Sequence, residues 1–390
     1  MRSIELFAGG GGLGLGLSIA GFKHEAVIER DKWSCDTIRQ NIKNNFPHVK
    51  DWKICEIDAR AFDYSSISSE IDLVSGGPPC QPFSLAGKHK ANKDHRDMFP
   101  VAIDVVKTLK PKAFIFENVK GISRSSFINY FQYIVLQLSF PEITIKEDEN
   151  WKSHLARLEK QKTRNLFSGL SYNVIARDIN AVDYGIPQQR HRVFIVGFRS
   201  DQNQGWCFPN PTHSLDSLIH SQWVTNDYWD RHYISKQEIP EISSRIQRRL
   251  KKLSVANSPL QLDLKPWKTV RDAFIGLPDP IICSSSKKFS NHIYQPGAKT
   301  YKGHTGSPLD LPSKTLKAGS HGVPGGENMI AFTNGNVRYF TVRESARLQT
   351  FPDTYLFHGS WSETMRQLGN AVPVELARIF GLSIKRALTQ

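Results

Sequence analysis

The first half of the chain alternates short apolar runs with helical patterns. Apolar runs without regular polar alternation predict strands that are buried on both faces. These runs cover residues 3–7, 25–29, 71–75, 113–117 and 193–198. Between them apolar residues recur at helical spacing, as at Val101, Val105 and Leu109. The alternation predicts an α/β fold with a mostly parallel sheet and helices on both faces.

The pattern changes near residue 199. Residues 199–337 are rich in Ser, Pro, Gly, His and Lys and have weak periodicity, apart from one amphipathic helix through Ile246 and Leu250. After residue 338 a compact pattern returns and ends in a predicted helix at 374–384. We therefore predict one domain built from residues 1–198 and 338–390, with a smaller, irregular domain at 199–337. Residues 141–168 form a polar, partly helical insertion.

Composition narrows the class of protein. The 390 residues are 39% hydrophobic and 23% charged, which fits a packed core, and the formal net charge of +14 favours a polyanionic partner such as nucleic acid. None of the five cysteines forms a CxxC pair, so we expect neither a zinc site nor a disulfide framework, and a reducing cytoplasm fits best. No apolar run reaches the length of a membrane span, and the apolar N-terminus lacks the basic region of a signal peptide.

A glycine-rich turn follows the first predicted strand. Gly9, Gly11 and Gly14 satisfy the pattern GxGxxG, and Glu29 closes the next strand. Glycine permits a tight turn and close approach of a ligand, while an acid at that position can accept hydrogen bonds from ribose hydroxyls. The combination predicts an adenosine-containing cofactor, which can be NAD or S-adenosylmethionine. A glycine-rich turn without a ligand has the same pattern.

Chemistry-bearing residues follow other predicted strands. Pro78 and Pro79 fix the backbone before Cys80. Core packing does not require a cysteine at this position, and a thiolate can act as a nucleophile. Glu117 ends the strand at 113–117, where a carboxyl group can act as an acid. Arg190 and Arg192 alternate before the strand at 193–198, so we expect both on one face, where they can bind phosphate or a base. Each residue also has an ordinary alternative. These are a buried cysteine for Cys80, a helix cap for Glu117, and a solvated basic strand end for Arg190 and Arg192.

Together these segments resemble the bacterial cytosine-C5 DNA methyltransferases of restriction–modification systems. The resemblance covers about 1–198 and 338–390 and rests on several blocks in the family's order. The blocks are residues 6–12 (LFAGGGG), 78–81 (PPCQ), 117–119 (ENV), 188–192 (QQRHR), 343–349 (RESARLQ) with 351–352 (FP), and 367–372 (QLGNAV).

The resemblance implies a covalent mechanism. Cys80 adds to C6 of a cytosine that has left the duplex stack, Glu117 binds or protonates N3, and Asn118 holds the strand end. Arg192 contacts the cytosine O2, with Arg190 in support. Residues 81–96 resemble the loop that closes over the flipped base.

The resemblance also implies an S-adenosylmethionine-dependent methyltransferase fold and a set of cofactor contacts, with S-adenosylhomocysteine as product. We expect Glu29 to hold the ribose, Asp58 the adenine amine, and Asn370 and Ala371 the methionine end. The full set is Phe7, Gly9, Gly10, Gly11, Gly12, Glu29, Arg30, Asp58, Ala59, Pro79, Met98, Asn370 and Ala371. The chain departs from the family at Arg30, where an aromatic residue is frequent, and at Glu5, where Asp is usual.

The implied partner is double-stranded DNA, read by residues 199–337 as a target recognition domain. A restriction endonuclease or defence-system proteins can accompany such an enzyme, and the family is usually monomeric. The basic helix around Arg248 is interpreted as an ordinary surface helix rather than a sequence reader. Three alternatives remain at this point: an RNA cytosine methyltransferase, a catalytically inactive relative that binds nucleic acid, and a nicotinamide-dependent oxidoreductase, which the glycine turn and Glu29 alone would permit.

Overall fold

The computed structural model describes residues 1–79, 97–164, 168–202, 205–256, 263–282, 289–302, 304–319 and 328–390, with only the backbone at 253–256. The chain forms two compact units. The first unit is Met1–Ile179, His191–Pro209 and Ala377–Gln390, and the second unit is Asn180–Arg190 and Asn210–Leu376. Residues 338–376 thus pack within the second unit. The division by function into 1–198, 199–337 and 338–390 stays a prediction, because compactness does not say which residues meet DNA.

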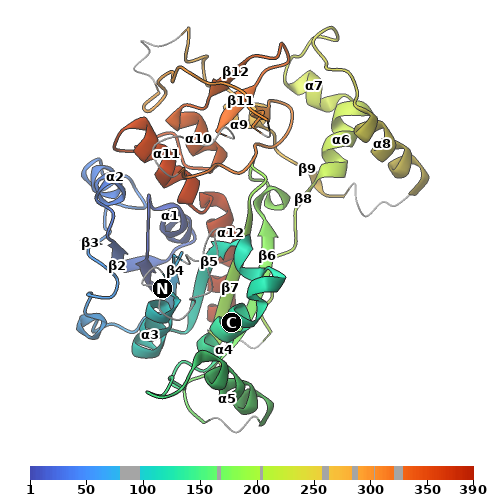
Figure 1. The fold of residues 1–390 in the computed structure, drawn as a ribbon. Helices are drawn as coiled ribbons and strands as arrows, with labels where there is room; N and C mark the ends of the chain where they lie inside the picture. Colours follow the sequence, from blue (N-terminus) through green and yellow to red (C-terminus); the bar gives the residue numbers. More distant parts are fainter. Residues whose placement is uncertain are drawn as a thin grey trace. The chain divides into compact units, whose positions relative to one another are not determined.

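A seven-stranded sheet forms the centre of the first unit, in the order β3-β2-β1-β4-β5-β7-β6 (Figure 1). The strands are β1 (Arg2–Leu6), β2 (Lys23–Glu29), β3 (Ile54–Glu56), β4 (Leu73–Gly76), β5 (Ala113–Val119), β6 (Tyr172–Asn180) and β7 (His191–Arg199). Neighbours from β3 through β5 pair in parallel, and β7 runs antiparallel to β5. The predicted mostly parallel sheet is confirmed.

Helices cover both faces of this sheet. They are α1 (Gly12–Ile19), α2 (Lys32–Lys43), α3 (Phe99–Leu109), α4 (Ile128–Ser139), α5 (Trp151–Arg164) and α12 (Val374–Thr389). Side chains alternate along β7: Val193 and Ile195 join the large apolar core with Ile134 of α4. Phe194 faces the other way, and its ring centre is 5.0 Å from that of Phe380 on α12. Because α5 lies within 141–168, the prediction that this segment is partly helical is also confirmed.

The register of the parallel strands places their carboxyl ends together. Leu6 pairs with Ile28 on one side and with Gly76 on the other, and Gly76 pairs with Phe116. The residues that follow β1, β2 and β4, and the last residues of β5, therefore meet at one edge of the sheet. This is the edge at which open α/β sheets bind ligands.

The second unit consists of short elements. They are β8 (His213–Ser214), α6 (Leu215–Trp223), α7 (Asp227–Arg231), α8 (Ser244–Ala256), β9 (Lys265–Pro266), α9 (Val270–Phe274), β10 (Ser307–Pro308), β11 (Met329–Ala331), β12 (Val337–Tyr339), α10 (Val342–Leu348) and α11 (Trp361–Asn370). The predicted amphipathic helix is confirmed as α8.

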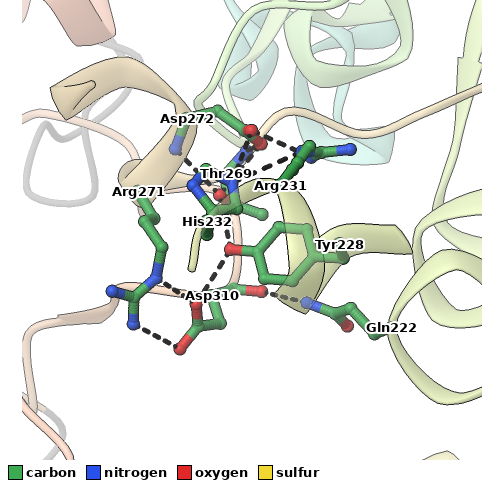
Figure 2. Close-up of polar contacts among 8 residues, drawn as sticks. All are labelled: Gln222, Tyr228, Arg231, His232, Thr269, Arg271, Asp272 and Asp310. Atoms are coloured by element: carbon green, nitrogen blue, oxygen red, sulfur yellow. Dashed lines mark hydrogen bonds and ion pairs between the residues drawn. The ribbon is translucent and has the colours of Figure 1, made fainter. Parts of the chain in front are cut away.

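A polar network joins α6, α7 and α9 to the segment at residue 310 (Figure 2). Asp310 accepts hydrogen bonds from Tyr228 at 2.8 Å and from Arg271 at 2.6 and 3.1 Å. Its carbonyl oxygen accepts from the amide of Gln222 on α6 at 2.8 Å. Asp272 accepts from Arg231 at 2.8 Å and closes the capping box of α9. Carboxylates therefore neutralise both arginines and fix these short elements to one another.

Candidate active site

The chain leaves β1 through a turn in left-handed backbone conformations. The φ angle is 54° at Phe7, 54° at Gly9 and 87° at Gly11, the residue that caps α1. Glycine adopts such angles at little cost, whereas Phe7 is strained there, as residues at binding sites often are. Gly10 is buried within the turn, and Gly12 begins α1. The N–H groups of the first helical turn thus lie beside the ligand-binding edge, where they can donate hydrogen bonds.

Glu29 ties the glycine turn to the end of β2. Its Oε2 accepts a hydrogen bond from the backbone N–H of Gly9 at 2.7 Å. Its Oε1 accepts from the N–H groups of Arg30 and Asp31, both at 2.8 Å. A carboxylate oxygen can accept two hydrogen bonds, and among the described contacts Oε2 accepts one. Glu29 is therefore fixed beside the turn with capacity for a hydroxyl donor, which fits the predicted contact with ribose.

Asp58 follows β3, the strand beside β2. The fork of Arg60 donates to both of its oxygens, at 2.9 and 2.7 Å, and Arg30 lies 3.5 Å away. These hydrogen bonds from Arg60 hold the pKa of the Asp58 carboxyl well below its usual range. Ala59, next in the chain, is buried and accepts a hydrogen bond from Tyr64 at 2.9 Å. Arg60 must share or release the carboxylate if Asp58 is to accept an adenine amine.

Two hydrogen bonds hold the ends of the segment that contains Cys80. The backbone N–H of Met98 donates to the carbonyl oxygen of Pro79 at 3.0 Å, so the chain returns beside the point at which it departs. The amide of Asn118, on β5, donates to the carbonyl oxygen of Pro78 at 2.8 Å. Cys80 and the predicted closing loop at 81–96 lie outside the described residues. Asn118 thus positions the backbone two residues before the predicted nucleophile.

Glu117 and Arg192 form a partly buried charge pair on neighbouring strands. Oε1 of Glu117 lies 2.8 Å from Nε of Arg192, and the two side chains are 10% and 15% exposed. Despite this contact, Oε1 accepts no hydrogen bond from the described residues. Oε2 lies over Gly77, where an added Cβ would be 3.4 Å away. The carboxylate therefore faces Arg192 through Oε1, which can still accept a proton or hydrogen bond, and faces the base of the Cys80 segment through Oε2.

Arg190 lies outside the strand that contains Arg192, because β7 begins at His191. The expectation that both arginines share one strand face stays a prediction. Arg190 is buried in the second unit, where its guanidinium donates to the carbonyl oxygens of Gly369 at 2.9 Å and Leu316 at 3.4 Å. Gly369 directly precedes two predicted cofactor contacts. The catalytic support predicted for Arg190 stays a prediction, and the structure gives it a positioning role.

Asn370 is exposed at the end of α11, and Ala371 is buried as its cap. Gln349 holds this corner through hydrogen bonds from its amide to the carbonyl oxygens of Leu368 at 2.5 Å and Ala371 at 3.2 Å. The positioning role of Gln349 was missed at the sequence level. Its place in the block 343–349 was the available signal, but periodicity alone cannot tell a side chain that binds backbone from one that packs.

Glu5 is a second residue that the sequence pattern does not reveal. It is fully buried on β1, where it contacts the Ser75 hydroxyl on β4 and the backbone N–H of Gly14. Burial raises its pKa from 4.5 to about 8. His24 on β2 donates to the carbonyl oxygen of the same glycine at 3.0 Å, and burial lowers the histidine pKa to about 4. Glu5 and His24 thus hold the start of α1 in place through their hydrogen bonds to the backbone of Gly14.

Replacing Glu5 by glutamine should flatten the pH dependence of stability on the alkaline side. The folded state keeps the Glu5 proton up to pH of about 8, while the unfolded chain releases it near 4.5, so the free energy of unfolding falls across this window. Each pKa unit is worth about 1.4 kcal/mol, and the total loss is on the order of several kcal/mol. Melting temperatures of both proteins between pH 6.5 and 9 test this. Both proteins contain His24, so its titration contributes equally to the two curves. Parallel curves for the two proteins would contradict the raised pKa of Glu5.

Metal and membrane features are negative findings. In the described ranges no group of three or more His, Cys, Asp or Glu side chains could hold a metal ion. No helix in the same ranges is both long and apolar enough to span a bilayer.

Comparison with known proteins identifies the family. The chain matches the family described as C-5 cytosine-specific DNA methylase over residues 1–142 and 149–386. It is 31% identical over 389 residues to the Type II methyltransferase M.PspPI of Psychrobacter sp. (strain TA137), a match that covers 99% of this chain and 79% of the relative. It is 28% identical to the Type II methyltransferase M.NgoMIV of Neisseria gonorrhoeae, with 99% and 97% covered.

A solved structure agrees at the level of the fold. The S. pombe Dnmt2 methyltransferase superimposes with a TM-score of 0.57 at 18% identity, covering 99% of each chain. The family match over residues 1–142 and 149–386 and the relative at 31% identity carry the assignment itself. The chain belongs to the C-5 cytosine-specific DNA methylase family.

Proposed function

We propose that this protein transfers a methyl group from S-adenosylmethionine to C5 of a cytosine in duplex DNA, with Cys80 as the covalent nucleophile. The observation that carries the proposal is the carboxylate of Glu117. It is buried at the ligand-binding edge, lies 2.8 Å from Arg192, and has an oxygen that accepts no hydrogen bond from the described residues. Asn118, its neighbour, holds the backbone that leads into Cys80.

The residues at the edge of the sheet fit the proposed cofactor. Glu29 has capacity for a ribose hydroxyl, and Arg30 lies with Asp58 where an adenine ring would be held. The other proposed contacts are Phe7, Gly9, Gly10, Gly11, Gly12, Ala59, Pro79 and Met98 in the first unit, and Asn370 and Ala371 in the second. When bound, S-adenosylmethionine supplies an electrophilic methyl group on a positively charged sulfur and leaves as S-adenosylhomocysteine.

The protein's own groups make C5 reactive. The thiolate of Cys80 forms a bond to C6, and the electron pair of the C5–C6 double bond shifts to C5 and, through C4, toward N3. Glu117 stabilises this charge by a hydrogen bond or proton to N3, while Arg192 contacts O2 and balances the carboxylate. C5 then takes the methyl group. Loss of the C5 proton restores the double bond and expels the Cys80 thiolate.

The target base must leave the duplex, because a thiol cannot reach C6 within the stack. Residues 81–96 are proposed to close over the flipped base, and residues 199–337 to select the sequence. The net charge of +14 supports binding to the DNA backbone. We assign the enzyme to a restriction–modification or related defence system, since the matched relatives are named Type II methyltransferases. We further propose that it acts in the cytoplasm as a monomer.

Duplex DNA that carries 5-fluorocytosine should trap the protein covalently. After methyl transfer C5 has no proton to lose, so Cys80 stays bound to C6. We expect a denaturation-resistant complex that requires S-adenosylmethionine and contains the added methyl group, with the linkage mapped to Cys80 by mass spectrometry. Methylation of ordinary DNA without any trapped complex, or a linkage to another residue, would remove this covalent route.

A further inference from the structure

Helix α8 exposes a row of basic side chains on one face. Arg245, Arg248, Arg249 and Lys252 follow the spacing i, i+3, i+4 and i+7, which places them on one side of a helix. All four are exposed, and together they line a shallow depression of about 360 Å³.

The opposite side of α8 is anchored. Ile246 and Leu250 are half-buried, and α8 contacts α6. Arg249, at the edge of the basic face, forms an ion pair with Asp216 of α6, whose carboxylate side chain is 10% exposed. Helix α6 is tied to residue 310 through Gln222 (Figure 2). The basic face of α8 therefore belongs to a fixed part of the second unit.

The charge on this face is unbalanced. Arg231 and Arg271, in the same unit, are each held by a carboxylate. In the described part of the chain, Arg245, Arg248 and Lys252 have no acidic partner within ion-pair distance. Like charges three and four residues apart repel one another and weaken a helix. An external anion would offset this repulsion.

We propose that this face of α8 binds the phosphate backbone of the DNA substrate; the inference rests on the proposed function. Among the described side chains of α8, at residues 244–252, the apolar ones are half-buried, which leaves no exposed apolar face for a lipid surface there. From Arg245 to Lys252 the helix rises by about 10 Å, which matches about three phosphates of one strand along the duplex axis. Contacts of this kind add affinity and fix orientation without reading sequence.

The test replaces Arg245, Arg248 and Lys252 by glutamine together in the full chain and leaves Arg249 with its partner. Binding to a 30-base-pair duplex is measured from 50 to 300 mM salt. The slope of log affinity against log salt should decrease by about 0.9 for each phosphate that is no longer neutralised, or by about 2 to 3 in all. Affinity at low salt should fall at least tenfold. S-adenosylmethionine binding and the set of methylated cytosines on a plasmid should not change, and the melting temperature should not fall, because removing like charges relieves their repulsion.

A matched control removes three charges from another exposed helix. Lys160, Lys162 and Arg164 of α5, in the first unit, are replaced by glutamine. The control should keep the wild-type slope. An unchanged slope in the α8 variant, or an equal decrease in both variants, would overturn the assignment of this surface. So would weakened binding to an RNA duplex with unchanged binding to DNA. A wild-type protein that binds no duplex DNA at any salt would instead reject the proposed function itself.

Discussion

Replacing Cys80 by alanine should abolish methyl transfer while S-adenosylmethionine still binds. Without the thiolate no bond forms at C6, and C5 of cytosine remains too weak a nucleophile to take the methyl group. We expect the turnover rate to fall by about 10⁴-fold or more, as for other enzymes that lose a covalent nucleophile. Turnover is measured by transfer of labelled methyl groups to DNA, and cofactor affinity by calorimetry.

Cys207→Ala provides the matched control, because Cys207 is a free, exposed cysteine far along the chain from the predicted nucleophile. It should transfer methyl groups at the wild-type rate. If the alanine variant at position 80 kept even a tenth of wild-type turnover, Cys80 would have no covalent role. If the variant at 207 were inactive instead, the nucleophile would have been assigned to the wrong thiol.

Replacing Glu117 by glutamine should lower the turnover rate by about 10² to 10⁴-fold, the usual contribution of a positioned acid. Glutamine has nearly the same size but cannot deliver a proton to N3, and it leaves the adjacent Arg192 without its carboxylate 2.8 Å away. The trapped complex with 5-fluorocytosine should form correspondingly slowly. Single-turnover methylation measures the chemical step apart from product release.

Two controls accompany this variant. Glu159→Gln removes one exposed carboxylate from α5 and should be silent. The melting temperature of Glu117→Gln distinguishes a chemical defect from a folding defect, because removing one partner of a buried pair can destabilise the protein. A stable Glu117→Gln enzyme with near-wild-type single-turnover rates would exclude protonation at N3 by this residue.

Strong apolar runs made most of the sheet predictable, and the exceptions have physical reasons. β3 comprises three residues, too few to show a period, and β6 at the sheet edge is mostly polar or half-buried along its length. The sequence also does not state that β7 runs antiparallel to β5, because strand direction depends on how the intervening chain returns. Helices α8 and α12 were visible because amphipathic spacing persists over several turns.

The residues of the candidate site also divide into those that the sequence predicts and those that it does not. Glu29, Glu117 and Asn118 could be predicted because they end apolar strands, and the strand ends converge on one edge. Arg190 could not be separated from Arg192, since both look like strand residues until the strand's first residue is known. Glu5 and Gln349 act through hydrogen bonds to groups distant in sequence, which no local pattern encodes. The glycine turn left NAD and S-adenosylmethionine open, and membership of a methylase family now favours the latter.

The central claim is tested most directly by identifying the labelled nucleoside. The purified protein is incubated with duplex DNA and methyl-labelled S-adenosylmethionine, and the DNA is digested to nucleosides. The account predicts that the label appears in 5-methylcytosine and is absent when Cys80→Ala replaces the wild type. Label in N4-methylcytosine or N6-methyladenine, or no label from a protein that binds both DNA and the cofactor, would contradict it.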